Sequence, residues 1–255
     1  MTTALFWFRK DLRLKDNLAW TKACESHRIH PVLILEPELI SNSGPYRRQQ
    51  FFSNVSALAA EIKSIGGELS IIQGPARDVL ARYIRENNID CIYFNADTTP
   101  FSRQRDEQLA KDISVPINTF WSGLVHPPET VLTQKGEISK VFTPFYKKWV
   151  TLPAPPSVED SQPIFVDAQQ NTWNETQDLI PSTSNQGYKA AIDRLEKFLK
   201  VVDDYHESRN FPSKEGTSFL SSDLHFGTIG PREILHRLSS NREGHRQFIR
   251  QLAWR

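Results

Sequence analysis

The chain has 255 residues, 38% of them hydrophobic and 24% charged, and its 31 basic and 30 acidic residues leave a net charge of +1 at pH 7. These proportions are typical of a globular protein with one large or two modest domains, and they exclude disorder throughout the chain. The near-zero net charge excludes a bulk electrostatic attraction to nucleic acid, so any such partner must be met by a local patch.

The cysteine content and the lengths of the apolar runs predict where the protein works. Two cysteines, Cys24 and Cys91, are typical of reduced structural thiols and not of a disulfide framework or a zinc site. Arg9, Lys10 and Asp11 interrupt the first apolar run where a signal peptide would need an unbroken core. No run approaches the roughly 18 to 20 apolar residues of a membrane span. We therefore expect a soluble, cytoplasmic protein without a membrane partner.

The first predicted element is a buried strand over residues 4–8 that ends abruptly in charged residues. After Arg9, Lys10 and Asp11, the pair Asp16-Asn17 gives a helix-start signal immediately before apolar residues. A strand, a charged loop and a helix in this order are the opening of a βαβ unit. In such a unit, ligands bind at the carboxyl end of the strand.

Further strands and helices alternate over the next hundred residues. Short apolar and partly β-branched runs predict strands at residues 31–35, 69–72, 91–94 and 117–120. Helices are predicted at residues 17–27, 46–65, 76–87 and 102–112. Because strands that alternate with helices of this length need crossover connections, the fold class is α/β. We expect a doubly wound parallel sheet, a Rossmann-like domain, over residues 1–130.

The composition changes after residue 150. Residues 151–185 contain no lysine or arginine, five acidic residues and five of the 16 prolines of the chain. Such a segment does not sustain a helix or a central strand. We predict an extended inter-domain connector over residues 131–185.

The last part of the chain, residues 186–255, has helical periodicity and predicts the start of an all-α domain. Apolar residues from Tyr188 to Val202 form an amphipathic stripe. Gly230-Pro231 begins a second helix, since proline is favoured at the first helical position. A third begins near Arg246 and meets no stop signal before Arg255, which suggests a chain cut within a helix.

A hydroxyl-rich turn lies between the first two of these helices. We define it as residues 209–222, with the sequence Arg-Asn-Phe-Pro-Ser-Lys-Glu-Gly-Thr-Ser-Phe-Leu-Ser-Ser. Hydroxyls, backbone N–H groups and a helix start are the donors that a phosphate or pyrophosphate needs. Serine and threonine are equally common in ordinary loops and helix caps, so the turn alone does not separate a cofactor site from a structural turn.

The last predicted helix has two distinct faces. The inward arc is made by Phe248, Ile249, Leu252 and Ala253. The other face carries Gln247, Gln251 and Trp254, with Arg250 and Arg255 at its borders. A tryptophan outside the core face either packs under a neighbouring helix or serves as an aromatic platform for a base.

These motifs together resemble the DNA photolyase and cryptochrome family, most closely the bacterial class I photolyases that repair cyclobutane pyrimidine dimers. The resemblance starts at residues 7–17 and returns some 200 residues later at residues 205–238 and 252–255. Shorter matches between them are Gly74-Pro75, residues 103–106 and residues 142–145. The similarity therefore spans nearly the whole chain.

The resemblance implies a deoxyribodipyrimidine photolyase, a flavoprotein whose reduced FAD donates a light-excited electron to a dimer flipped out of UV-damaged DNA. Photolyases are among the enzymes known to flip bases. Carried over by motif position, the FAD contacts would come from Tyr205, Thr217, Ser218, Phe219, Leu220, Ser221 and Phe248. The residues facing DNA would be Arg209, Gln251, Trp254 and Arg255. The resemblance implies no metal and no catalytic residue within the chain, and we expect a monomer.

Three departures from the family pattern leave alternatives open. Gln251 stands where dimer repairers typically have a glutamate. A cryptochrome-type blue-light photoreceptor is therefore kept as an alternative function. The antenna chromophore of the family is a folate or a deazaflavin, and the folate-binding Asn-Glu pair falls here at Phe101-Ser102. Because Ser102 cannot replace a carboxylate in kind, a deazaflavin, a flavin or no antenna is expected in place of folate.

The third departure is length. In family members the chain continues beyond the position of Arg255 for about as many residues as residues 186–255 contain. That continuation carries the rest of the FAD pocket. We therefore expect a fragment with an incomplete FAD site that binds FAD weakly and repairs nothing by itself. Without the resemblance, the chain reads as an α/β nucleotide-binding protein with a helical interaction module.

Overall fold

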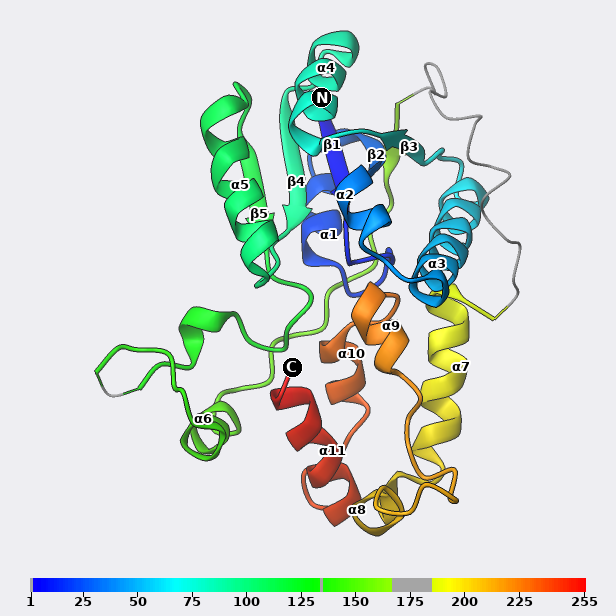
Figure 1. The fold of residues 1–255 in the computed structure, drawn as a ribbon, viewed down its shortest axis with the longest axis vertical. Coiled ribbons are helices and arrows are strands. Elements are labelled where there is room, and N and C mark those ends of the chain that lie inside the picture. Colours follow the sequence, from blue (N-terminus) through cyan, green and yellow to red (C-terminus); the bar gives the residue numbers. More distant parts are fainter. Residues whose placement is uncertain (1, 134, 167–184) are drawn as a thin grey trace.

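The computed structural model describes residues 2–133, 135–166 and 185–255. Figure 1 shows a sheet with its covering helices in the upper part and a group of helices, α7 to α11, below it. Part of the predicted connector, residues 167–184, lies outside the described residues. Within the described residues, no helix combines the length and apolar character that crossing a membrane would require.

The sheet is parallel and doubly wound, as the sequence predicts. Its strands are β1 (Thr2–Phe8), β2 (His27–Leu35), β3 (Ser70–Gln73), β4 (Cys91–Asn95), β5 (Ile117–Phe120) and the short β6 (Ile164–Phe165). The order is β3-β2-β1-β4-β5, and β6 pairs with the first residues of β2. Because the order reverses beside β1, the carboxyl ends of β1 and β4 flank the topological switch point, where ligands bind in folds of this type.

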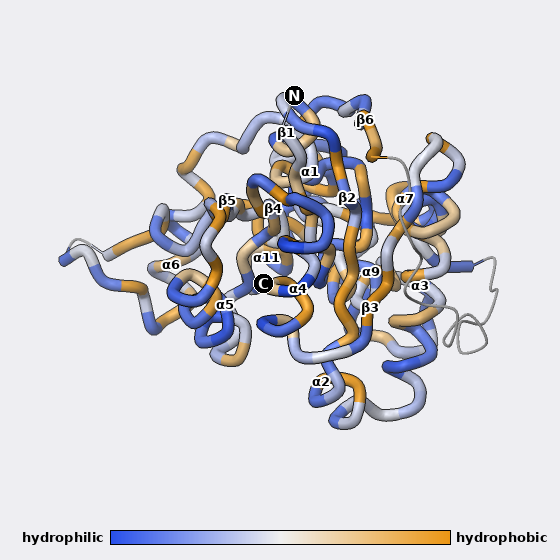
Figure 2. The backbone as a smooth tube through the Cα atoms, turned by 90° about the horizontal axis from the view of Figure 1, so that it is seen from above, coloured by the Kyte–Doolittle hydropathy of each residue, from blue (hydrophilic) through white to orange (hydrophobic). Residues whose placement is uncertain are grey.

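Alternating residues of β1 enter two different cores. Phe6 and Phe8 pack with Trp20 and with the long helix α3, whereas Leu5 and Trp7 belong to the core on the opposite face. The helices of this region are α1 (Leu18–Cys24), α2 (Pro37–Ser41), α3 (Pro45–Ser64), α4 (Ala76–Asn87) and α5 (Pro100–Asp112). Strands buried on both faces are expected to be hydrophobic, and Figure 2 shows β2 with a hydrophobic stretch, which residues 32–35 provide.

The helical part has its own core. Its elements are α7 (Gly187–Leu199), η3 (Val202–Asp204), α8 (Tyr205–Ser208), α9 (Ser221–Phe226), α10 (Pro231–His236) and α11 (Glu243–Ala253). Leu195, Phe198 and Ile234 lie in this core with residues of α8 and α11. The inward arc predicted for the last helix is confirmed, since all four of its residues are buried.

Two sequence-based boundaries were wrong. The helix expected at residues 17–27 ends at Cys24, because β2 begins at His27 and pairs with β1 from Thr2 onward. The connector, expected to be extended, contains the helix α6 (Phe142–Trp149). Pro144 lies in its first turn, where a missing N–H costs nothing. The end of the described connector is also tied to the sheet, since β6 extends it.

The loop after β1 joins the sheet to the helical part through Arg13. This side chain is fully buried, and its Nη1 donates to the Gly227 carbonyl at 2.9 Å. Its Nη2 donates to the carbonyls of Asp16 (2.8 Å) and Ser122 (2.9 Å). Gly227 ends α9 with a φ of +67°, and a Cβ there would lie 2.1 Å from the Lys10 carbonyl oxygen. The backbones of the two parts are therefore in direct contact.

Candidate functional site

A buried polar network lies at the switch point of the sheet. The Asp11 carboxylate accepts the Arg9 N–H at 2.8 Å. It also accepts the side-chain amides of Asn17 (3.3 Å) and Asn95 (2.6 Å). Asn95 Nδ2 donates a second time, to Asn17 Oδ1 at 2.7 Å. Apart from Asn95 Oδ1, which has no partner among the described residues, these buried groups satisfy one another, and the network fixes the corner where β1, β4 and α1 meet.

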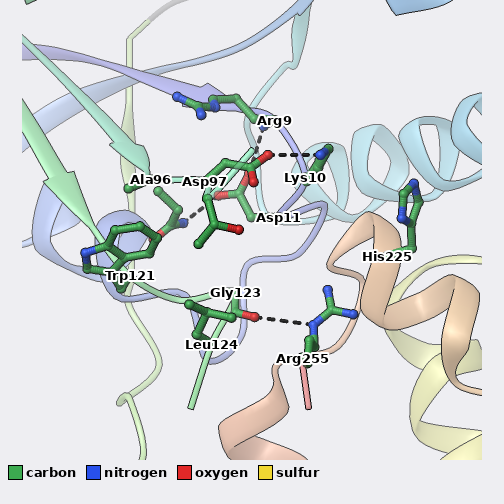
Figure 3. A pocket seen from close by; sticks show the side chains of 12 residues that line it. Arg9, Lys10, Asp11, Ala96, Asp97, Trp121, Gly123, Leu124, His225 and Arg255 are labelled. Carbon is green, nitrogen blue, oxygen red and sulfur yellow. Dashed lines mark hydrogen bonds and ion pairs between the residues drawn. The ribbon is translucent and has the colours of Figure 1, made fainter. Parts of the chain in front are cut away.

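A cavity of about 230 Å³, which we call the junction cavity, opens beside this network. It is lined from the ends of β1, β4 and β5 and, from the helical part, by His225 and Arg255. Figure 3 shows Trp121 and His225 on opposite sides of it. Its position at the switch point, between the two parts of the chain, is where α/β proteins hold ligands.

Asp97 is held ionised at the edge of the junction cavity. Burial alone raises the pKa of its carboxyl group, but the hydrogen bond and ion pair with Lys10 Nζ at 2.9 Å outweigh it. The Thr99 N–H (3.1 Å) and the Ser102 hydroxyl (3.2 Å) also donate to this carboxylate. Together these donors lower the pKa of Asp97 to about 2.

Replacement of Asp97 with asparagine is expected to remove a pH-dependent part of the stability. Because the pKa in the fold, about 2, lies below the ordinary value of 3.8, the carboxylate stabilises the fold above the ordinary value and loses this effect as the pH falls towards 2. The difference in free energy of unfolding between wild type and Asp97→Asn, measured in urea, should shrink over that acidic range. A difference that stays constant with pH would contradict this assignment.

A second cavity of about 260 Å³, the apolar cavity, lies next to the first and shares Arg9, Lys10, Asp97 and His225 with it. The end of β2, the helices α2 and α3 and one side of α5 line it. Two of its lining residues, Trp7 and Arg9, have buried donors, Nε1 and Nη2, without an acceptor among the described residues. Apolar side chains of β2 beside the basic Arg9 and Lys10 make the apolar cavity suited to a flat ligand that carries acceptor oxygens.

Three of the predicted FAD contacts form one buried cluster. Tyr205 and Phe248 meet edge to face at 5.2 Å between ring centroids, and Leu220 is fully buried in the same core. The guanidinium carbon of Arg209, predicted to face DNA, lies 5.7 Å from the Tyr205 ring centroid, and Arg209 is exposed. The structure therefore brings these residues from α8, the hydroxyl-rich turn and α11 to one place.

The hydroxyl-rich turn presents the other predicted FAD contacts outward. Thr217 and Ser221 are exposed, and Ser218 Oγ accepts the Leu220 N–H at 3.3 Å. Phe219 is 64% exposed and has a φ of +53°. A bulky residue held in the left-handed region is strained, and such strain concentrates at binding and catalytic sites.

The terminal helix separates the remaining predicted DNA contacts. Gln251 is exposed and Trp254 is 62% exposed, so both lie on the outer face of α11. Arg255 turns the other way, and its guanidinium donates to the carbonyls of Gly123 (3.4 Å) and Leu224. Figure 3 shows it facing the junction cavity. Gln251 and Trp254 thus share a surface from which Arg255 is absent.

Sequence reasoning missed one neighbour of Trp254. Phe142 of α6 stacks on the indole with 3.9 Å between ring centroids and an interplanar angle of 10°. The guanidinium carbon of Arg250 lies 5.4 Å from the Phe142 ring centroid. The available signal was the aromatic spacing in residues 142–149, where Phe142, Tyr146 and Trp149 fall on one side of a helix.

Comparison with known proteins identifies relatives over almost the whole chain. A deoxyribodipyrimidine photo-lyase of Synechococcus sp. is 29% identical over 98% of this chain and 58% of its own length. Among solved structures, a class III photolyase from Agrobacterium tumefaciens has a TM-score of 0.88 and 25% identity, and covers 100% of this chain and 57% of its own. An archaeal photolyase from Sulfolobus tokodaii has a TM-score of 0.80 and 25% identity, covering 99% of this chain and 57% of its own.

The chain therefore spans less than three fifths of the length of each of these relatives. The sequence model of the family described as DNA photolyase matches residues 4–161. This range contains the sheet except for the first two residues of β1 and the short strand β6. As this match covers more than half of the 255 residues, the chain belongs to the DNA photolyase family.

Proposed function

We propose that the protein takes part in light-driven repair of pyrimidine dimers in UV-damaged DNA, as a deoxyribodipyrimidine photolyase. The observation that carries the proposal is the outward position of Trp254. Its indole is 62% exposed, although the opposite face of the same helix is buried. Exposed aromatic rings flanked by cations are the platforms on which proteins stack single-stranded or flipped bases.

The residues proposed to hold FAD fit the chemistry of that cofactor. The hydroxyl-rich turn offers hydroxyl and N–H donors, and its one acidic residue, Glu215, is outnumbered by the basic Arg209 and Lys214. The nearest following acid, Asp223, is buried and paired with Arg194 at 2.6 Å, so it does not repel a diphosphate. Thr217 and Ser221 are exposed and available to phosphate oxygens. The rings of Tyr205 and Phe248, buried against each other beside the turn, would complete the residues that hold the cofactor.

In this proposal the protein contributes positioning and electrostatics. Reduced FAD, excited by light, supplies the electron that splits the dimer. Trp254 stacks on the extruded pyrimidines, and Gln251, three residues earlier on the same helix, offers an amide to their edges. Arg209 and Arg250 provide positive charge for backbone phosphates. Arg255 contributes indirectly, because its hydrogen bonds tie the end of α11 to the junction cavity.

An antenna chromophore is proposed for the apolar cavity. Its apolar lining from β2 beside the basic Arg9 and Lys10 supports a flat chromophore with carbonyl oxygens, such as a deazaflavin or a flavin. The archaeal photolyase with a similar fold contains two FAD molecules. Folate held by an Asn-Glu pair is disfavoured, because Phe101 and Ser102 stand at those positions and the Ser102 hydroxyl is engaged by Asp97. Monomeric state and cytoplasmic location remain predictions.

The proposal is tested with the protein expressed from its native gene and loaded with reduced FAD. Illumination with a thymine-dimer oligonucleotide should restore intact thymines, measured by chromatography, and no restoration should occur in the dark. A protein that binds FAD but leaves the dimers unchanged in light would be a cryptochrome-type photoreceptor. The observation that favours this second candidate is Gln251, exposed where dimer repairers typically carry a glutamate.

Replacement of Trp254 with alanine is expected to weaken binding of the dimer oligonucleotide by about 1–3 kcal/mol, the value of one base stacked on an aromatic ring. The dissociation constant can be measured by fluorescence anisotropy of a labelled oligonucleotide. Tyr46→Ala, which removes an exposed aromatic ring in the first turn of α3, is the matched control and should bind as the wild type does. Equal affinities of wild type and Trp254→Ala would exclude the stacking role.

A further inference from the structure

The surface around Trp254 is built by two segments that are far apart in the sequence. Trp254 follows α11, and Phe142 begins α6 of the connector, yet their rings stack at 3.9 Å between centroids and 10° between planes. Trp254 is nevertheless 62% exposed. A stack on one face combined with that exposure means that Phe142 covers one side of the indole and leaves the other side open.

The stack continues along α6 and is anchored in a core. Phe142 and Tyr146 stack at 5.6 Å, and Tyr146 and Trp149 at 6.2 Å. Trp149 is buried and packs with Ile249 and other residues of α11 in a shared cluster. Since this cluster fixes α6 against α11, the position of the Phe142 ring does not depend on its contact with Trp254 alone.

Arg250 completes the arrangement. Its guanidinium carbon lies 5.4 Å from the ring centroid of Phe142 and 5.8 Å from that of Tyr146. On α11 it precedes Trp254 by four residues, so the two side chains are neighbours on one face. An exposed guanidinium held over two rings keeps its charge beside the indole and retains donors for a phosphate.

We propose that Phe142 is a positioning residue for nucleotide binding. Its ring holds the Trp254 indole in one orientation, with the open face ready for a base, while Arg250 lies at the edge for the adjoining phosphate. This inference rests on the proposed function, which assigns Trp254 to base stacking. An exposed tryptophan without such support must be ordered on binding, and that cost corresponds to about 2- to 12-fold in affinity.

The test compares variants of Phe142 that keep or remove the flat ring. The probes are a single-stranded thymidine oligonucleotide and the same oligonucleotide with one thymine dimer, and the readout is the dissociation constant at fixed salt. Phe142→Leu keeps an apolar side chain but loses the stack, and should weaken binding about 2- to 12-fold. Phe142→Tyr keeps the ring and should bind as the wild type does. Thermal unfolding of each variant verifies that it folds.

The salt dependence of binding separates the role of Phe142 from that of Arg250. Arg250→Gln should lower the slope of log affinity against log salt concentration by about 0.7, the value for one phosphate contact on a single strand. Phe142→Leu should leave that slope almost unchanged while weakening binding. A Phe142→Leu slope reduced as much as that of Arg250→Gln would overturn a role exerted through the indole.

The remaining outcomes distinguish this inference from the proposed function. If Trp254→Ala weakens binding and Phe142→Leu does not, the positioning role is wrong and the stacking function stands. If Phe142→Leu strengthens binding, the Phe142 ring blocks access of the base to the Trp254 indole, and the inference is overturned. Equal loss in Phe142→Leu and Phe142→Tyr would also overturn it, because the flat ring would not matter. If neither oligonucleotide binds the wild type at low salt, or if Trp254→Ala has no effect, the proposed function itself fails.

Discussion

Replacing Arg13 with leucine is expected to lower the free energy of unfolding by about 3–5 kcal/mol, the range for removing one partner of a buried charged contact. Arg13 is fully buried and donates to the carbonyls of Gly227, Asp16 and Ser122. Leucine fills part of the space but leaves these three acceptors without donors. A buried ion pair can be replaced without loss when both partners become apolar, but backbone carbonyls cannot be replaced.

The measurement is urea unfolding of the two proteins at neutral pH. Arg85→Leu, on the exposed side of α4, is the matched control and should change the free energy of unfolding by less than about 0.5 kcal/mol. Arg13→Lys should fall between, since lysine keeps the charge but lacks the planar fork that reaches several carbonyls. An Arg13→Leu protein within about 1 kcal/mol of the wild type would show that water replaces the lost donors.

Replacing Gly227 with alanine should destabilise the protein by about 2–5 kcal/mol, from the sum of a strained backbone and a steric overlap. The φ of +67° disfavours any side chain, and the new Cβ would lie 2.1 Å from the Lys10 carbonyl oxygen. That oxygen belongs to the backbone of the loop after β1, so it cannot rotate away. The junction between the sheet and the helical part must therefore open.

Gly66 provides the control for the strain alone. Its φ is +88°, and an added Cβ would meet nothing within 4 Å. Gly66→Ala should therefore cost only about 1–2 kcal/mol. The excess loss in Gly227→Ala, measured by urea unfolding, reports the overlap at the junction. Equal losses in the two variants would mean that the junction accommodates the extra carbon.

Local patterns were sufficient to predict most of the sheet region. The helix expected at residues 76–87 is α4, Ala76–Asn87, because its apolar periodicity is strong and Asn88 ends it in the left-handed conformation. β2 is longer than its apolar core, since pairing with β1 extends it back to His27. Pairing partners are remote in the sequence, so no local pattern could reveal this extension.

The candidate site was predictable in its parts but not in its assembly. The outward position of Trp254 and the burial of Phe248 follow from helical spacing and are confirmed. The direction of Arg255 was not predictable, because its acceptors are the carbonyls of Gly123 and Leu224. The support of Trp254 by Phe142 was missed because the extended connector was predicted over residues 131–185, although its proline-rich composition begins only at residue 151, and packing on α11 stabilises α6.

The hydrogen bond between Arg13 and Gly227 spans 214 positions of the chain. During synthesis on the ribosome, the guanidinium of Arg13 emerges early and stays in water until α9 has been made. Until then the loop after β1 cannot enter a dry environment, because its charge has no acceptor from α9. The sheet can assemble as its strands appear, whereas the loop that borders both cavities is sealed only when the helical part arrives.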